Sequence, residues 1–179
     1  MRIIGGLYRS RRIKMVGVET TRETTDMVRE SIFNLMSSLR IEGVGLDLFS
    51  GSGAMGLEAL SRGLDFCYFN DKGREAYKIT QENIKELKLE DKTKVLNRDY
   101  KDAIKMIDKK LDMVFLDPPY KLDSINEVLQ ILKEDDMLNE NAYIVIEAEK
   151  EYQVKLLDYY EIYKERIYGI RKIVILRLA

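Results

Sequence analysis

Short apolar segments alternate with helical patterns through the middle of this 179-residue chain, and this alternation constrains its fold more than any other feature. Between the apolar segments, side chains such as Thr80, Ile84 and Leu87 recur at helical spacing. Strands that are apolar along their whole length are typical of a parallel sheet covered on both faces by helices. The predicted strands are 44–49, 66–69, 94–96, 113–116 and 143–146.

The C-terminal part of the chain departs from this alternation. Residues 160–168 and 173–178 are β-rich and are joined around Gly169, without room for a crossover helix. Two strands connected in this way must pair antiparallel. The sequence therefore predicts an α/β fold whose seven-stranded, mostly parallel sheet ends in an antiparallel C-terminal hairpin.

The N-terminal part is expected to add a small extension to this sheet. Residues 1–20 are expected to form an extension that carries a short β-hairpin, and residues 21–179 to form a single domain. An apolar stripe over residues 28–39 predicts a helix, for which Thr24 or Thr25 is the expected N-cap.

The composition excludes several kinds of chemistry. The chain has no His and no Trp, Cys67 is its single cysteine, and its two prolines are adjacent. His-based triads, Cys–His nucleophiles, His/Cys zinc sites and disulfide scaffolds are therefore excluded. Cys67 lies in the middle of a predicted strand and is expected to be a small core residue. Any chemistry must rely on carboxylates, amides, hydroxyls, backbone groups and a cofactor.

The net charge of −1 conceals an uneven distribution along the chain. Residues 1–40 carry a net charge of +4 and residues 150–179 carry +3, so residues 41–149 carry −8. Basic flanks around an acidic centre suggest contact with a polyanion, although an ordinary solvated surface would account for much of this charge. No signal peptide or membrane span is recognisable, and the single cysteine favours a cytoplasmic protein.

A glycine-rich loop follows the first predicted strand. Gly51, Gly53 and Gly56 fit the pattern G-x-G-x-x-G, in which glycine permits a positive φ and a close approach of ligand to backbone. Asp71 lies 20 residues after Gly51, at the end of the second strand, where a carboxylate can bind ribose hydroxyls. These features alone suit a nicotinamide dinucleotide and S-adenosylmethionine equally well.

Two further acids favour S-adenosylmethionine. Asp47 lies just ahead of the loop, where its carboxylate would repel a pyrophosphate but attract the ammonium of a methionine moiety, directly or through water. Asp99 follows the third strand and is well placed to accept a hydrogen bond from an adenine amino group. Acids at strand ends also cap helices, which is the ordinary structural alternative. Three such acids on successive strands, together with the glycine loop, favour S-adenosylmethionine.

The segment Asp117-Pro118-Pro119-Tyr120 follows the fourth strand, at the sheet edge where open α/β folds bind ligands. Its two prolines fix φ and remove two N–H donors, which leaves a stiff segment with free carbonyls. The exocyclic amine of a nucleobase is a poor nucleophile. Hydrogen bonds from this amine to the Asp117 carboxylate and the Pro118 carbonyl would free its lone pair for attack on a sulfonium methyl. The ring of Tyr120 offers a face on which the base can stack, and such stacking contributes about 1–3 kcal/mol per base. Such a transfer needs orientation and electrostatics but no metal.

Four stretches of the chain are typical of one methyltransferase family: 2–6, 24–34, 46–63 and 117–120. With them the chain resembles the RsmD-type 16S ribosomal RNA (guanine-N2)-methyltransferases over nearly its whole length. The resemblance implies a Rossmann-like class I fold and transfer of a methyl group from S-adenosylmethionine to N2 of a guanine in 16S rRNA, the guanine 966 site. S-adenosylhomocysteine would be the product. The implied partner is 16S rRNA or a small-subunit assembly intermediate, and the implied protein is a cytoplasmic monomer.

The resemblance also assigns roles to further residues. In this family an N-terminal hairpin contributes to RNA contact, which suits residues 2–14, with five basic side chains and no acid. Gly73 stands where the family often has an acid, which leaves Asp71 alone for the ribose. Beside the motif residues, the expected site includes Phe49, Ser52, Lys72 and Tyr100 for the cofactor, and Arg2, Arg9, Arg11, Arg12, Lys14, Arg22, Thr25 and Arg29 for RNA.

Other functions remain open. An amino methyltransferase acting on DNA adenine N6 or on protein glutamine N5 would use the same proline–aromatic motif, although the chain is short for a separate DNA-recognition domain. A non-catalytic RNA-binding module would keep the fold, but it would not need the intact site residues. An NAD-binding oxidoreductase is disfavoured by Asp47 and gives no role to the segment 117–120.

Overall fold

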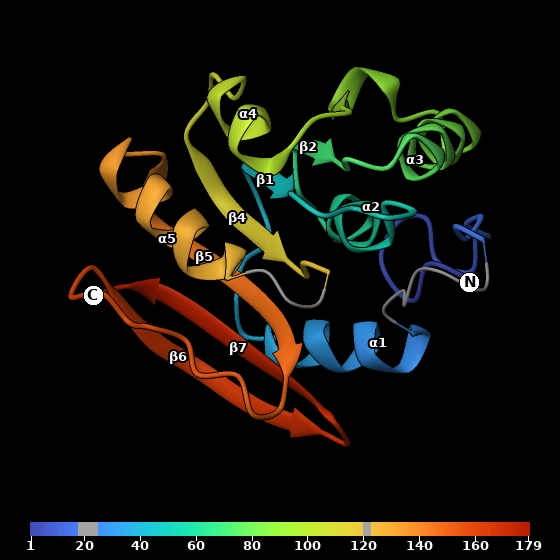
Figure 1. Ribbon diagram of the computed structural model, residues 1–179. Helices are drawn as coiled ribbons and strands as arrows, with labels where there is room; N and C mark the ends of the chain where they lie inside the picture. The colour runs from blue at the N-terminus through green and yellow to red at the C-terminus, as the bar shows by residue number, and fades with distance from the viewer. Residues whose placement is uncertain (18–24, 120–122) are drawn as a thin grey trace.

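The computed structural model describes residues 1–17, 25–119 and 123–179. Within these ranges the chain forms a seven-stranded sheet with helices on both faces (Figure 1). The strands are β1 (Val44–Asp47), β2 (Phe66–Asn70), β3 (Thr93–Leu96), β4 (Leu111–Leu116), β5 (Leu138–Glu149), β6 (Tyr160–Tyr168) and β7 (Arg171–Leu178).

The strands lie in the order β3-β2-β1-β4-β5-β7-β6. Strands β1 to β5 pair parallel, and β7 pairs antiparallel with both β5 and β6. The predicted α/β class, with an antiparallel C-terminal hairpin, is therefore confirmed. Strand β5 extends beyond the predicted segment 143–146, because its last residues, Glu147 to Glu149, pair with β7 through the backbone. Backbone pairing needs no apolar side chain, so hydrophobicity alone could not show this extension.

The helices form one layer on each face of the sheet. The core has two clusters of buried hydrophobic side chains. Residues of the first three helices along the chain belong to one cluster, and residues of the last two helices belong to the other. Each described helix is too short or too polar to cross a membrane. The helices are α1 (Asp26–Leu35), α2 (Ala54–Ser61), α3 (Arg74–Glu86), α4 (Tyr100–Lys105) and α5 (Ser124–Glu134).

Helix α1 begins where the sequence predicts it and ends earlier. The Thr25 hydroxyl accepts a hydrogen bond from the Val28 amide at 3.3 Å, which confirms one of the two predicted N-caps. The apolar stripe continues to Leu39, but the helix stops at Leu35 and the backbone turns, with the Leu39 amide bonded to the Met36 carbonyl at 2.8 Å. The two serines in between are weaker helix formers than leucine and methionine, which favours an end to the helix here.

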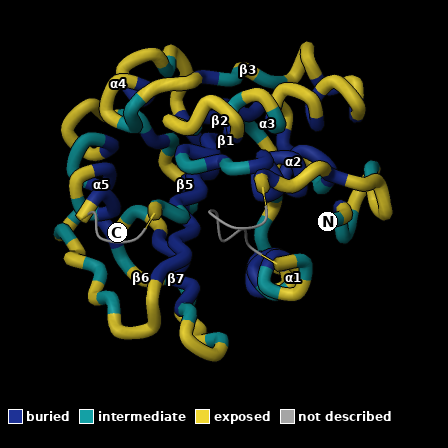
Figure 2. Tube along the Cα trace, turned by 45° about the vertical axis from the view of Figure 1, so that its right-hand side comes forward, coloured by how far each residue is buried: buried dark blue, intermediate teal, exposed yellow. Residues whose placement is uncertain are grey.

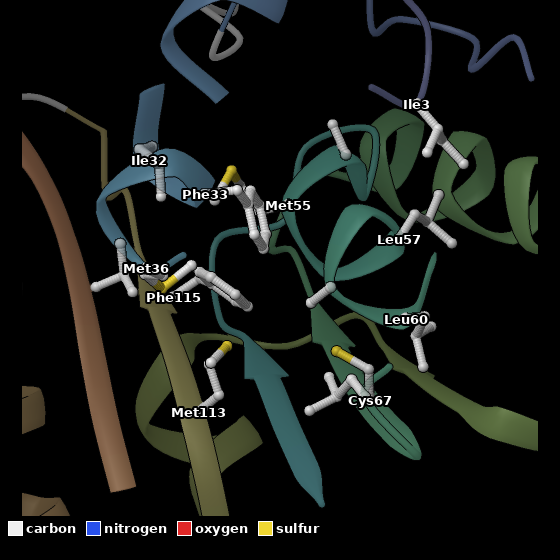
Figure 3. Close-up of a cluster of buried hydrophobic side chains, with 14 of the residues drawn as sticks. Ile3, Ile32, Phe33, Met36, Met55, Leu57, Leu60, Cys67, Met113 and Phe115 are labelled. Atoms are coloured by element: carbon white, nitrogen blue, oxygen red, sulfur yellow. The ribbon is translucent and has the colours of Figure 1, made fainter. Parts of the chain in front are cut away.

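The core between α1, α2 and the sheet contains both aromatic and sulfur-bearing side chains. Figure 3 shows Phe33 of α1, Met55 of α2 and Phe115 of β4 in this core, and the centroids of the two phenylalanine rings lie 6.1 Å apart. Cys67 is fully buried there, and burial raises the pKa of its thiol. The prediction that Cys67 is a core residue is confirmed.

The N-terminal segment, residues 1–17, lies over α2 and α3. It contains a single antiparallel bridge, Arg2 with Arg12, and its apolar residues Ile3 and Ile13 are buried. The segment covers Glu58 and Ser61 on the side of α2 that faces away from the sheet, and all eight residues of α2 are buried, so that Figure 2 shows α2 as a dark helix. A helix that is apolar around most of its surface needs such a cover.

Arg29 of α1 is wholly buried, so the prediction that it contacts RNA is wrong. Its Nε donates to Glu58 Oε1 of α2 at 3.1 Å, and its Nη2 donates to the Arg2 carbonyl. Glu58 also accepts from the amides of Ile4 and Gly5, at 2.8 and 3.0 Å. Removing one partner of such a buried pair typically costs about 3–5 kcal/mol. Arg29 therefore holds the N-terminal segment onto α1 and α2.

Candidate functional site

The loop between β1 and α2 adopts a backbone that requires glycine. Gly51 and Gly53 have φ of 55° and 86°, in the left-handed region that other residues rarely adopt. A Cβ added at Gly56 would lie 2.4 Å from the ring of Phe69, so this glycine lets α2 pack closely on β2. The three glycines of the motif thus shape a loop whose backbone a ligand can approach without a side chain in the way.

Asp47 ends β1 directly beneath this loop. Its side chain is buried, and its Oδ2 accepts a hydrogen bond from the Gly56 amide at 3.0 Å. Burial raises the pKa of Asp47 to about 7, the nearby Asp71 charge adds to this rise, and the Gly56 hydrogen bond opposes it. Without a ligand, Asp47 therefore changes its charge near neutral pH.

Replacing Asp47 with Asn should change how stability depends on pH. The pKa of the carboxyl is higher in the folded protein than in the unfolded chain, so its favourable contribution is complete below pH about 4 and is lost as the pH rises through about 7. The Asn variant has no charge to bury, so its stability relative to the native protein should grow over this range and level off above pH 7. Urea unfolding of both proteins between pH 4 and 8 measures this difference. A constant difference across that range would show that Asp47 stays ionised when buried.

Asp71 follows β2 and holds the glycine loop. Its Oδ2 accepts from the Gly51 amide at 2.9 Å, and its Oδ1 accepts from the Gly73 amide at 2.8 Å. A carboxylate offers about four acceptor positions, so these two bonds leave capacity for hydroxyl donors. The structure thus places Asp71 beside the loop, as the motif spacing predicts. The side chain of the next residue, Lys72, is exposed.

Helix α3 supports the loop from the other side, which the sequence did not indicate. The Thr80 hydroxyl donates to the Gly51 carbonyl at 2.8 Å, and the Asn83 amide donates to the Ser52 carbonyl at 2.9 Å. Asn83 also pairs with the backbone of Lys14, accepting from its amide at 2.8 Å and donating to its carbonyl at 3.0 Å. One buried asparagine therefore connects the N-terminal segment to the glycine loop.

Two aromatic rings and an acid lie at the next strand ends. The rings of Phe49, after β1, and Tyr100, in α4, have centroids 5.7 Å apart. Asp99 caps α4, accepting from the Lys101 amide at 3.1 Å. Tyr100 donates its hydroxyl to Glu127 of α5, and burial with this bond raises its pKa. Asp99 therefore has the capping role that the sequence left open as an alternative, and one carboxylate can cap and accept a further hydrogen bond.

Asp117, Pro118 and Pro119 follow β4, while the predicted Tyr120 lies outside the described residues. Arg171, the first residue of β7, donates from Nη2 to Asp117 Oδ1 at 3.0 Å. The same guanidinium donates from Nε to Glu147 of β5 at 3.2 Å. The side chains of Asp117, Arg171 and Glu147 are 27%, 19% and 9% exposed, so this charged group is largely shielded from water.

The basic side chains predicted to bind RNA are exposed along the N-terminal segment: Arg2, Arg9, Arg11, Arg12 and Lys14. Two of them contact α3, since Lys14 pairs with Glu82 at 2.8 Å and Arg11 donates to the Glu86 carbonyl at 3.0 Å. Thr25 is exposed and serves as the N-cap of α1, and the predicted Arg22 lies outside the described residues. The segment therefore presents positive charge to the solvent and is anchored by the buried side chains of Ile3, Ile13 and Val16.

Comparisons with known proteins agree with this arrangement. The family model described as conserved hypothetical protein 95 matches residues 1–177. YlbH of Bacillus subtilis, which carries a provisional name as an rRNA methyltransferase, is 40% identical over 157 residues, which cover 86% of this chain and 85% of YlbH. Ribosomal RNA small subunit methyltransferase D of Haemophilus influenzae is 32% identical over 173 residues, which cover 95% of this chain and 90% of that protein.

A solved structure extends the likeness to three dimensions. The Escherichia coli protein yhhF, provisionally named a methyltransferase, superposes with a TM-score of 0.88 and 27% identity, over 99% of this chain and 97% of that one. The sequence match and the shared architecture therefore cover essentially the whole chain. The chain belongs to the RsmD-type family of ribosomal RNA small subunit methyltransferases.

Proposed function

We propose that this chain is an S-adenosylmethionine-dependent methyltransferase that methylates N2 of a guanine in 16S rRNA, the guanine 966 site by resemblance to the family. The observation that carries the proposal is the position of β1 between β2 and β4. The glycine loop and Asp71 follow β1 and β2, and Asp117 with its two prolines follows β4. Because parallel strands end at the same edge, a donor bound at the loop lies next to the diproline segment.

The residues of the loop fit S-adenosylmethionine. Asp71 would accept the ribose hydroxyls, Asp99 would accept from the adenine amine, and Phe49 and Tyr100 provide apolar surface for the base. Asp47 is the acid nearest the loop on β1, and a cationic amino group bound near it would favour its ionised form. When bound, this cofactor supplies a methyl group attached to a positively charged sulfonium. The sulfur becomes a neutral sulfide, a good leaving group, once the methyl group has been transferred.

The diproline segment would orient the acceptor. The Asp117 carboxylate and the Pro118 carbonyl accept the two N–H groups of the guanine amine and hold its nitrogen lone pair toward the methyl group. The new N–C bond forms as the C–S bond breaks, the electron pair of that bond goes to sulfur, and one N–H proton leaves the amine. The carboxylate of Asp117 is the adjacent proton acceptor.

The N-terminal segment would bind the RNA backbone, and replacing Arg9, Arg11 and Arg12 with Ala should weaken that binding. Each arginine that neutralises a phosphate contributes about 0.7–0.9 to the slope of log affinity against log salt, so losing three contacts should flatten the slope by about 2–3. Filter binding of 16S rRNA across a salt series measures both quantities. As a matched control, replacing the exposed Lys105, Lys109 and Lys110, before β4, with Ala removes the same amount of positive charge from another part of the surface. Equal slopes for the two triple variants would place the RNA-binding face elsewhere.

The test of the proposal is a methyl-transfer assay with labelled S-adenosylmethionine and several acceptors. We expect transfer to 16S rRNA or to small-subunit assembly particles, with the label recovered as N2-methylguanosine. If the label is recovered on DNA adenine or on protein glutamine, the proposed substrate is wrong, although the reaction is still a methyl transfer to nitrogen. Cofactor binding without transfer to any of these acceptors would contradict the proposal. An rRNA substrate places the enzyme in the cytoplasm, and sedimentation of the purified protein tests the expected monomer.

A further inference from the structure

We propose that Arg171, anchored by Glu147, is the positioning residue that fixes the carboxylate of Asp117 for the methyl acceptor. This inference rests on the proposed function, in which Asp117 contacts the target amine. The antiparallel C-terminal hairpin would then contribute directly to the geometry of the site, in addition to completing the sheet.

The register of three neighbouring strands brings these side chains together. Leu116 of β4 is aligned with Ile146 of β5, so the residues that follow them, Asp117 and Glu147, point to the same face. Glu147 is opposite Ile173 of β7, and Arg171 lies two residues from this position on the same face. A diagonal neighbour of this kind lies within reach of a long side chain.

The guanidinium is suited to this bridging role. Its planar group directs Nε–H and Nη2–H to two different carboxylates, at 3.2 Å to Glu147 and 3.0 Å to Asp117. At the same time, Pro118 restricts the backbone of Asp117 to extended conformations. The proline therefore limits the backbone of the acid, and the arginine limits its side-chain rotamers.

A second ion pair on the same strand shows what an ordinary surface contact looks like. Arg177 at the far end of β7 pairs with Glu161 of β6, and both side chains are nearly half exposed. Pairs of this kind contribute little, because water screens them. The side chains of Arg171 and Glu147 are much less exposed, at 19% and 9%, and the second carboxylate that Arg171 binds, Asp117, belongs to the diproline segment. Arg177 is therefore a matched control.

The experiment compares R171Q, R171K and R177Q in methyl transfer, cofactor binding and thermal unfolding. We expect R171Q and R171K to lower kcat by about 10- to 100-fold, since a misplacement of about 1 Å costs about 100-fold. Lysine keeps the positive charge but lacks the planar guanidinium that reaches both carboxylates, so the loss of kcat in R171K should approach the loss in R171Q. The Kd for S-adenosylmethionine should not change, and R177Q should match the native protein in every assay. Crystal structures of R171K and the native protein should differ in the side-chain rotamer of Asp117.

A double variant separates positioning from a general structural effect. If Arg171 acts through Asp117, then adding R171Q to D117N should cause no further loss of kcat, whereas independent effects would multiply. Multiplying effects, or native kcat in R171K and R171Q, would overturn the role of Arg171 while leaving the proposed function intact. Full activity in D117N and D117A would instead remove the proposed function of the segment. If R171Q unfolds, R171K and E147Q answer the same question, because E147Q keeps an acceptor but loses the anchoring charge.

Discussion

Replacing Asp117 with Ala should strongly lower the rate of methyl transfer while leaving the binding of S-adenosylmethionine nearly unchanged. The carboxylate would accept an N–H of the target amine, and removing one such oriented hydrogen bond in an active site typically costs about 100- to 1,000-fold in kcat. The acid follows β4, outside the glycine loop, so the loop keeps its hydrogen bond to Asp71 in this variant. Asn keeps one acceptor oxygen and loses the charge, and it should have intermediate activity.

Single-turnover transfer to 16S rRNA and calorimetric titration of the cofactor measure the two quantities separately. Asp158, an exposed acid between β5 and β6, provides a matched control, because D158A removes the same charge away from the site. Native turnover in D117A would show that the diproline segment is structural. A parallel loss of cofactor affinity would instead show that Asp117 belongs to the donor site.

Replacing Asp71 with Ala should weaken the binding of S-adenosylmethionine by about 100-fold. A hydrogen bond to a charged group contributes about 1.5–3 kcal/mol, and the ribose would offer two hydroxyl donors. The variant also loses the bonds from Asp71 to the Gly51 and Gly73 amides, so the loop itself becomes less well fixed. Both effects act in the same direction.

Thermal unfolding without ligand distinguishes the two effects. The D71N variant keeps one acceptor oxygen and should recover more of the loop's stability than of the cofactor affinity. Glu75, an exposed acid in the first turn of α3, is the matched control for charge. A D71A protein that unfolds at a lower temperature but binds the cofactor with native affinity would reduce Asp71 to a loop-holding residue.

The sequence predicts the parallel part of this fold well because buried strands have a distinctive composition. Segments such as residues 66–69 are apolar along their length, which is typical of a sheet covered on both faces. The ends of elements were less predictable. Strand β5 continues through polar residues because β7 pairs with its backbone, and α1 stops before Leu39 although its apolar stripe continues.

The site was predictable where local sequence determines it. The glycine loop and the acids that follow the parallel strands come from adjacent motif residues, and the structure brings them to one edge. Arg171 and Glu147 could not be found in this way, because their contact depends on the register of an antiparallel hairpin distant in sequence. Arg29 was assigned to RNA through the family resemblance, and only the packing of Glu58 of α2 against it shows that it is buried.

Mass mapping of 16S rRNA from cells with the native gene, without the gene and with the D117A variant tests the central claim most directly. The account predicts that one guanine, at the 966 site, carries an added methyl group on N2 with the native gene only. The same methylated guanine in all three strains, or its absence from all three, would contradict the account.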